Sequence, residues 1–533
     1  MLIAPIAIAF AIRFGSPLSP APGASAPSNL SLPTPSTLFQ RHSRAYGLLP
    51  LGGIRWSGTL TSGDTQATYE VVADSTGHYR QDSNLPLSTH AEGDDGNVYW
   101  QQDENGNVTS VPATSHHGAV SRLLRLNDYK FDVAGATVAG IMNIDGHLAY
   151  AVHARIGATD AVLYIDVASA LVDGGDFGSR TVRYHAYKRF EGVPVPTQAI
   201  DDDGTTSTTT TVDSVQFATH TSAATFAAPT QREPDMPAGV SQITVPFESE
   251  RGLIELDCRI NDKPVKLLLD SGSSTNVIDS SSATRLGMPT GGVAKINAAS
   301  ELDGTITRAD KLTVGDATFH DFVMEAVPLN LPRALAQDHI DGIIGYDVLA
   351  QLVARISYYN NNVQFTLPTA FKYSGTGAVM PMTITNRVPR IDAKLGRSHD
   401  AVTLTVDTGS DGALVLYRSY ADSHADDFET LSLGNMDPMD SRVTRGPDLA
   451  SPIKPAVDSA SGAGGGDIPV RLATISRMDL GQFSIVDLFT QVVLRSTGAF
   501  APTQSDGILG AGALSKFGAV FLDYPNTRVI LEK

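Results

Sequence analysis

The chain has 533 residues, 42% of them apolar and 18% charged, which is the composition of a globular protein and a length that suits about two to four domains. Its net charge of -18 and its pI of about 5.1 argue against nucleic acid as the main partner. Cys258 is the only cysteine, which excludes an internal disulfide and a cysteine-based zinc site. No HExxH motif occurs, so we expect no metal and no other cofactor.

The N-terminal segment predicts export. An apolar run, Leu2 to Ile12, is too short to span a bilayer but fits the core of a signal peptide, and "ASA" at Ala24 to Ala26 is a candidate cleavage site. We therefore predict a signal peptide over residues 1–26 and a periplasmic or secreted protein without a stable membrane span. No Lys or Arg precedes the apolar run, so either the true start lies upstream or the protein is not exported.

Residues 36–228 predict an antiparallel β domain. Several short segments alternate apolar and polar residues between Gly, Asn and Asp turns: "IRWSGTL", "ATYEVVA", "HLAYAVHA", "AVLYIDV" and "RTVRYHAYKRF". The clearest hairpin is "VYWQQDENGNVTSV", which carries an Asn-Gly turn. The Thr-rich stretch 203–212 fits a loop or an edge strand, and the Pro-rich and charged residues 229–242 fit a linker.

Residues 243–533 contain an internal repeat, with one copy in 243–368 and the other in 379–533. Both copies run from a strand-rich lead through a Gly-centred hairpin to an apolar-apolar-Gly element and a closing strand pair. The Gly elements are "DGIIGYDVL" and "DGILGAGAL", and the closing pairs are "VARISYYNNNVQFTL" and "GAVFLDYPNTRVILE". Four ordered matches predict a duplicated β unit.

In each copy an Asp also stands directly after an apolar, strand-like segment, in "KLLLDSGSS" and "TLTVDTGSD". A lone Asp-Ser/Thr-Gly is usually a plain turn, but two copies in matching frames imply a pseudo-twofold axis that brings Asp270 and Asp407 together. Two carboxyl groups in contact cannot both ionise cheaply, so they share a proton and supply a general base beside a general acid. Such a pair can activate water for attack on a peptide carbonyl without a metal.

On these motifs, residues 243–533 resemble a two-lobed, single-chain aspartic peptidase of the retropepsin or pepsin type. The resemblance implies that Asp270 and Asp407 are the catalytic dyad. It implies supporting roles for residues beside them: Ser271 and Thr408 brace the two turns, Gly272 and Gly409 support the carboxylates, and Ser273 and Ser410 hydrogen-bond beside them. The hydrophobic-Gly elements beneath the turns are then Ile343, Ile344 and Gly345, with Ile508, Leu509 and Gly510.

The sequence departs from the pepsin pattern at the flap. Neither Tyr nor Trp occurs between Asp279 and Gly345, so the flap tyrosine of pepsin-like enzymes is missing. We expect a flap in Gly291 to Asp310, closer to the retroviral type, and a glycine-rich counterpart in Gly462 to Leu472. This departure affects how a substrate is gripped more than it affects the dyad.

The first block resembles the lipoprotein-carrier type of β fold, an antiparallel sheet curved around an apolar cavity. The likeness rests on the strand series, on Tyr164 and Asp166, and on the hairpin from Gly192 to Pro196. It implies a possible apolar ligand for residues 36–228. A generic antiparallel sheet domain is the alternative.

Overall, the sequence predicts a mainly β aspartic endopeptidase that acts on a peptide or protein substrate and exists as a monomer. Three other readings stay open. The fold can be a catalytically silent protein that grips an extended peptide by β-augmentation. The first block can carry the function by binding a lipid or apolar segment, or it can be a removable pro-region.

Overall fold

The computed structural model describes residues 32–47, 52–63, 65–74, 76–113, 135–156, 159–178, 180–204, 207–250, 252–297, 301–329, 340–396, 399–424, 428–430, 457–461, 467–494 and 505–533. By its contacts the chain divides into two compact units, one ending at Thr230 and one spanning Gln231–Lys533. The predicted signal peptide, residues 1–26, lies outside the described residues, so export stays a prediction.

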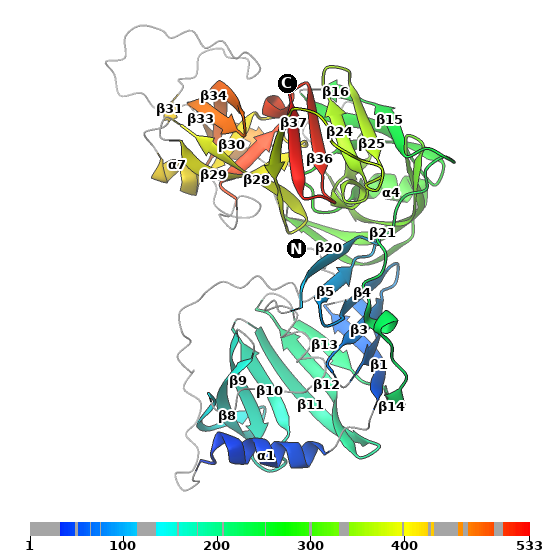
Figure 1. The fold of residues 1–533 in the computed structure, drawn as a ribbon, viewed down its shortest axis with the longest axis vertical. Helices are drawn as coiled ribbons and strands as arrows, with labels where there is room; N and C mark the ends of the chain where they lie inside the picture. The colour runs from blue at the N-terminus through cyan, green and yellow to red at the C-terminus, as the bar shows by residue number, and fades with distance from the viewer. Residues whose placement is uncertain are drawn as a thin grey trace. The chain divides into compact units, whose positions relative to one another are not determined.

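The first unit is built on one 14-stranded antiparallel sheet (Figure 1). Its strands are β1 (Gly53–Ser62), β2 (Thr65–Ala73), β3 (Tyr79–Asn84), β4 (Thr89–Asp94), β5 (Val98–Gln102), β6 (Val108–Pro112), β7 (Thr137–Ile144), β8 (His147–Ile156), β9 (Thr159–Asp166), β10 (Val172–Phe177), β11 (Arg180–Phe190), β12 (Val193–Asp202), β13 (Ser207–Thr211) and β14 (Ser214–Thr219). Two meanders, β1 to β6 and β7 to β13, join where β1 pairs with β13, and β14 also pairs with β1.

The sheet confirms the predicted antiparallel domain and corrects one detail of it. The Asn-Gly hairpin forms as expected, since β5 pairs with β6 from Val98 and Pro112 to Gln102 and Val108. The Thr-rich stretch is neither a loop nor an edge. Its strand β13 hydrogen-bonds to β12 on one side and to β1 on the other, because β-branched threonines suit an interior strand.

Among the described residues of this unit, two helices pack on the sheet, and the sequence predicted neither. Helix α1 (Pro35–Tyr46) has Pro35 in its first turn and Thr34 as its N-cap, whose hydroxyl accepts the Thr37 N–H at 3.2 Å. Leu38 of α1 is buried in the apolar cluster of strands β8 to β11. Helix α3 (Ala223–Phe226) is fixed by the buried Trp100, whose indole N–H donates to the Phe226 carbonyl at 2.7 Å.

The second unit contains two sheets of matching design. The first half forms β15 (Gln242–Pro246), β16 (Glu248–Glu250), β17 (Leu253–Ile260), β18 (Lys263–Leu269), β19 (Val277–Asp279), α4 (Ser280–Leu286), β20 (Thr290–Asn297), β21 (Glu301–Val314), β22 (Ala317–Val327), β23 (Gly342–Ile344), α6 (Tyr346–Leu349), β24 (Val353–Ser357) and β25 (Asn362–Thr366). The second half forms β26 (Ala378–Pro381), β27 (Thr383–Thr385), β28 (Val388–Leu395), β29 (Asp400–Asp407), β30 (Leu414–Tyr417), α7 (Arg418–Ser423), β31 (Phe428–Thr430), β32 (Val457–Ser461), β33 (Asp467–Leu480), β34 (Phe483–Val493), β35 (Gly507–Gly510), α8 (Ala511–Leu514), β36 (Ala519–Asp523) and β37 (Arg528–Glu532).

The pairing order of the two sheets confirms the duplication. One sheet runs β16-β17-β18-β23-β19-β22-β21-β20 and the other β27-β28-β29-β35-β30-β34-β33-β31. In each, the strand before the Asp turn pairs in parallel with the Gly-element strand, β18 with β23 and β29 with β35. The strand after the turn then pairs antiparallel with that same Gly-element strand.

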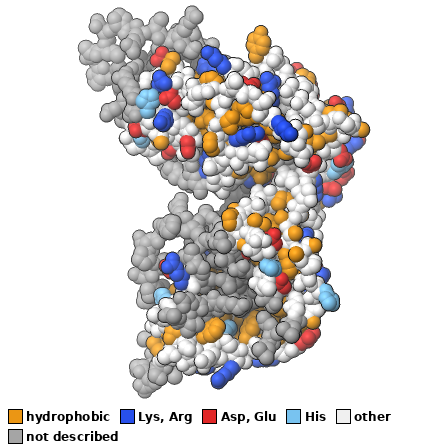
Figure 2. Space-filling model, viewed as in Figure 1, with side chains coloured by type: hydrophobic (Ala, Val, Ile, Leu, Met, Phe, Trp, Pro, Cys, Tyr) orange, Lys and Arg blue, Asp and Glu red, His pale blue; other side chains and the backbone are white. Residues whose placement is uncertain are grey.

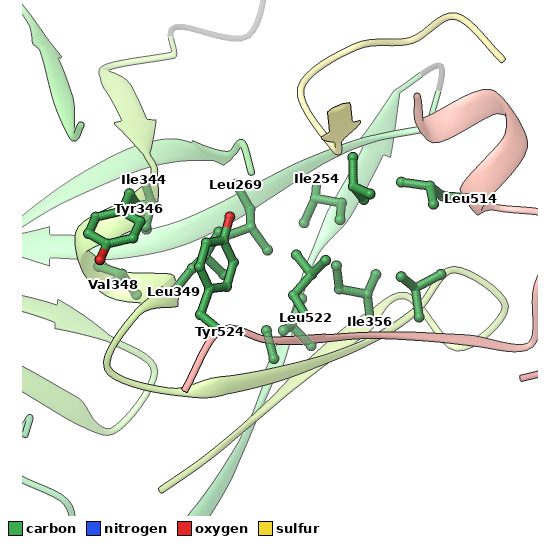
Figure 3. Close-up of a cluster of buried hydrophobic side chains, with 14 of the residues drawn as sticks. Ile254, Leu269, Ile344, Tyr346, Val348, Leu349, Ile356, Leu514, Leu522 and Tyr524 are labelled. Atoms are coloured by element: carbon green, nitrogen blue, oxygen red, sulfur yellow. The ribbon is translucent and has the colours of Figure 1, made fainter. Parts of the chain in front are cut away.

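A third sheet joins the halves. Its six strands run β15-β25-β24-β36-β37-β26, three from each half, and the junction is the antiparallel pair β24 and β36 (Figure 1). One face of this sheet packs into the main core of the unit, which includes Leu269, Ile356, Leu514 and Leu522 (Figure 3).

The other face carries a small aromatic and cationic cluster. The Phe521 ring lies 5.8 Å from the ring of Phe371 and 5.5 Å from that of Tyr373, and the Arg355 guanidinium lies 5.6 Å from the Phe521 ring centre. Figure 2 shows hydrophobic side chains gathered with Lys and Arg side chains over this part of the unit.

Within the described ranges, every helix is too short or too polar to cross a bilayer. The same ranges contain no group of His, Cys, Asp or Glu side chains placed to hold a metal ion.

The shared sheet generates a stability prediction. Ile356 of β24 is fully buried in the core at the junction of the two halves. Replacing it with Ala is expected to lower the free energy of unfolding by about 2–5 kcal/mol, because the mutation leaves a cavity. Urea unfolding of the full chain measures this. Tyr359→Ala in the adjoining turn, at a side chain that is 90% exposed, should change stability by no more than about 0.5 kcal/mol. Equal effects of the two mutations would contradict the packing described.

Candidate active site

The first Asp turn follows strand β18, which ends at Leu269. The Asp270 N–H donates to the Ile344 carbonyl at 2.9 Å, which ties the turn to the Gly-element strand β23. One carboxylate oxygen of Asp270 accepts the N–H groups of Gly272 at 2.8 Å and Ser273 at 3.1 Å. Asp270 is therefore held in a fixed orientation by backbone on both sides.

The second turn repeats this arrangement. Asp407 is the last residue of β29 and pairs in register with Gly510 of β35. One carboxylate oxygen of Asp407 accepts the Gly409 N–H at 2.8 Å, and the Ser410 N–H also hydrogen-bonds to this carboxylate. The structure thus places the predicted supporting residues Gly409 and Ser410 where their counterparts lie in the first half.

The structure brings Asp270 and Asp407 together, and their carboxyl groups hydrogen-bond to each other. Each carboxyl group also faces the glycine of the opposite turn. A Cβ on Gly272 would lie 2.5 Å from the Asp407 Cγ, and one on Gly409 would lie 2.3 Å from the Asp270 Cγ. Only glycine allows the turns to approach so closely, since Cβ atoms in proteins essentially never make non-bonded contacts shorter than 3.0 Å.

Four buried hydrogen bonds brace the turns against each other. The Ser271 N–H donates to the Thr408 hydroxyl at 3.0 Å, and the Thr408 N–H donates to the Ser271 hydroxyl at 3.0 Å. Each hydroxyl then donates across the interface, that of Ser271 to the Val406 carbonyl and that of Thr408 to the Leu269 carbonyl, both at 2.8 Å. Ser271 and Thr408 are both fully buried. The sequence predicted this bracing role from the resemblance alone.

The two hydrophobic-Gly elements lie beneath the turns, as expected. Strand β23 contains Ile343 and Ile344 and leads into Gly345, while β35 contains Ile508, Leu509 and Gly510. The residue after each glycine donates its N–H to the turn, Tyr346 to the Ser273 carbonyl at 3.0 Å and Ala511 to the Ser410 carbonyl at 2.7 Å. Each element therefore supports the loop that carries its own Asp.

The aspartates that open these elements have a structural role that sequence reasoning missed. A carboxylate oxygen of Asp341 accepts the Lys266 N–H at 2.9 Å, and the Asp341 N–H donates to the Lys266 carbonyl at 2.8 Å. Asp506 makes the same two bonds with Thr403, at 2.9 and 2.8 Å. Their repeated "DG" was visible in both halves of the sequence and was the signal that could have found them.

A buried polar chain on one side of the site was also missed. The Asn276 side chain accepts the Gly345 N–H at 2.8 Å and donates to the Asp347 carboxylate at 2.7 Å. Arg387, from the second half, lies 3.7 Å from the other oxygen of Asp347. The second half has Ala413 and Gly512 where the first has Asn276 and Asp347, so comparing the repeats gave no signal.

Burial raises the pKa of the Asp270 carboxyl above the ordinary value for Asp. Burial, followed by the charge of Asp270, raises the pKa of the Asp407 carboxyl well above that value. The hydroxyl of Tyr417, at the end of β30, is affected by the same pair. Burial, followed by the charge of Asp407, raises the pKa of Tyr417 to about 12. The arrangement favours a pair that holds one proton between the two carboxyl groups.

Two hairpins occupy the segments where flaps were expected. Strands β20 and β21 pair from Thr290 and Thr307 to Asn297 and Glu301. In the second half, β32 pairs with β33, ending at Ser461 and Asp467. The tips, residues 298–300 and 462–466, lie outside the described residues, so the role of these hairpins as flaps stays a prediction.

Comparison with known protein families finds a match within the first half of this unit. Residues 256–348 match the family model described as aspartyl protease. The match contains the Asp270 turn and Gly345 and ends before the second half begins. This segment therefore has an aspartyl-protease-like fold. No curated protein matches the chain.

Two solved structures are similar to the chain in fold. One is a LolA superfamily protein from Nitrosomonas europaea, with 12% identity and a TM-score of 0.29, which covers 37% of this chain and 98% of its own. The other is a DUF1329 family protein from Desulfovibrio piger, with 11% identity and a TM-score of 0.28, which covers 36% of this chain and 95% of its own.

The bracing bonds generate a stability prediction. Ser271→Ala removes one hydroxyl and leaves the Thr408 N–H and the Val406 carbonyl without their partners in a buried site. We expect the free energy of unfolding to fall by about 1–3 kcal/mol. Ser419→Ala, the same change at an exposed helical position, serves as the control and should stay within about 0.5 kcal/mol of wild type. Urea unfolding of the full chain compares them, and equal stability of the two variants would contradict the bracing role.

The raised pKa of the dyad generates a prediction about stability and pH. The folded protein retains protons that the unfolded chain releases, so the dyad's contribution to stability is complete below the unfolded-state pKa of about 3.9. It is lost as pH rises through the folded-state pKa. We expect Asp407→Asn to lose less stability than wild type as the pH rises above about 4. The exposed Asp310→Asn should follow wild type. Parallel curves for wild type and Asp407→Asn in denaturant titrations would exclude a shared proton.

Proposed function

We propose that this protein is an aspartic endopeptidase in which Asp270 and Asp407 activate one water molecule for hydrolysis of a peptide bond. The observation that carries the proposal is the contact between the two carboxyl groups. Each is held by its own turn, and the turns are braced by the reciprocal bonds of Ser271 and Thr408. The family match of residues 256–348 supports it independently.

In the proposed reaction the pair carries one proton. The ionised carboxylate, assigned to Asp270, takes a proton from water as the water oxygen bonds to the peptide carbonyl carbon. The protonated Asp407 donates to the carbonyl oxygen, which becomes a hydroxyl of the tetrahedral intermediate. As the intermediate collapses, the C–N bond breaks, Asp270 gives its proton to the leaving nitrogen, and Asp407 takes a proton back from one hydroxyl of the intermediate, whose carbon becomes that of the product carboxylic acid. The dyad ends with one proton, as it began.

The architecture around the dyad supports an extended peptide as the substrate. The hairpins β20–β21 and β32–β33 belong to the same two sheets as the Asp turns, one from each half. A peptide lying between them would meet strand edges, which bind extended backbone through main-chain hydrogen bonds. Export, a monomeric state and an apolar ligand in the first unit remain predictions from the sequence.

The proposal predicts the loss of activity on removing either carboxylate. Asp270→Asn and Asp407→Asn should each reduce cleavage of a random peptide pool by at least about 10³-fold, because each leaves only one of the two proton-transfer groups. Asp316→Asn, at an exposed turn position outside the predicted flaps, serves as the matched control and should cut like wild type. Mass spectrometry of the pool across about pH 3 to 8 gives the readout.

Two further outcomes decide against the peptidase. If folded wild type cuts nothing at any pH but binds peptides and a statine-type inhibitor, the unit is a silent peptide-binding protein. If cleavage persists in both Asp→Asn variants, another site or a contaminant is responsible.

A further inference from the structure

Two tyrosines occupy matching positions in the repeat, each directly after a strand of the shared six-stranded sheet. Tyr358 follows strand β24 and Tyr524 follows strand β36, and these two strands pair at the centre of the shared sheet. Both side chains therefore leave the sheet at the start of equivalent hairpin turns. Neither residue has a role in the mechanism proposed above.

Tyr524 reaches from the second half to the Asp turn of the first half. Its hydroxyl donates to the main-chain carbonyl of Ser271 at 3.3 Å. Tyr524 is 3% exposed and Ser271 is fully buried, so no solvent replaces this bond if it is lost. Ser271 is the residue that follows Asp270, which places the tyrosine in contact with the Asp turn itself.

The ring of Tyr524 contacts the same turn through a second residue. It packs edge to face on Tyr346, with ring centres 5.8 Å apart, and Figure 3 shows the two rings side by side. The Tyr346 N–H donates to the Ser273 carbonyl. Tyr524 thus supports the turn both at Ser271 and, through Tyr346, at Ser273. Arg387, also from the second half, lies 5.5 Å from the centre of the Tyr346 ring.

The corresponding contacts are different in the other half. Ala511 stands in the position of Tyr346, so no second ring is available there. The Tyr358 hydroxyl is buried and has no hydrogen-bond partner among the described residues, while its ring packs on Phe247 at 6.2 Å. Of the two tyrosines, only Tyr524 holds an Asp turn by a hydrogen bond in the part of the chain that the structure describes.

We propose that Tyr524 is a positioning residue that holds the Asp270 turn in the geometry needed for proton transfer, and that Tyr358 has no equivalent role. The inference rests on the proposed peptidase function for its kinetic consequence. Its structural consequence, restraint of the turn, stands without that function. The two halves of the dyad are then unequally supported although their sequences repeat.

The repeat supplies a matched pair of variants, Tyr524→Phe and Tyr358→Phe. Both remove one buried hydroxyl and keep the ring. We expect Tyr524→Phe to lower kcat by about tenfold or more with KM within about twofold, since a displaced catalytic group affects the chemical step. Tyr358→Phe should leave both constants within about twofold of wild type. Titration with a statine-type inhibitor normalises each rate to the fraction of folded sites.

Amide hydrogen exchange supplies a readout that does not need activity. The Gly272 and Ser273 N–H groups donate to Asp270, so a loosened turn should exchange them about tenfold faster in Tyr524→Phe than in wild type. In Tyr358→Phe, the Gly409 N–H should exchange at the wild-type rate.

The outcomes separate the two proposals. If wild type cuts no peptide, the proposed function fails, and the exchange rates at Gly272 and Ser273 still decide the role of Tyr524. If wild type cuts and the two Phe variants match in kcat and in exchange, the positioning role is overturned. A lower Tm for Tyr524→Phe with unchanged kcat per titrated site also overturns it, because the hydroxyl then serves stability alone.

Discussion

Two partly buried carboxyl groups stay in contact only if the chain restrains them, and the reciprocal bonds between the Ser271 and Thr408 turns supply that restraint. Each hydroxyl both accepts a backbone N–H and donates to a carbonyl of the strand that precedes the opposite Asp. If either turn shifted, buried N–H and carbonyl groups of the other would lose their hydrogen-bond partners, and this would lower the stability of the folded protein. The glycines and the Gly-element strands are arranged around this fixed centre.

The two Asp turns and both hydrophobic-Gly elements were visible in the sequence because each motif is short and occurs twice, and the structure brings Asp270 and Asp407 together. The bracing role of Ser271 and Thr408 came only from the family resemblance. Helix α1 was missed although Thr34 and Pro35 carry an ordinary helix-start signal. The interior position of β13 was not predictable, since local composition does not reveal which strands lie on either side.

Contacts that break the repeat were the least predictable part. Asn276, Asp347 and Arg387 form a chain that crosses between the halves, and only one half has the residues for it. Tyr346 and Tyr524 likewise meet across the halves and have no ring pair at the matching position. Such contacts depend on three-dimensional proximity between distant segments, so no spacing in the sequence indicates them. Duplication explains the fold, while the differences between the copies determine how each carboxyl group is supported.

The shared six-stranded sheet has a consequence for the order of events during synthesis. Its strand β15 precedes both Asp turns along the chain, whereas β36 and β37 follow every strand of the two Asp sheets. A growing chain on the ribosome therefore lacks two of the six strands, β36 and β37, until translation of this unit is nearly finished. Until then β24 has no β36 beside it, and Tyr524 cannot reach the first turn. A nascent chain therefore carries both aspartates before the sheet that joins the two halves is complete.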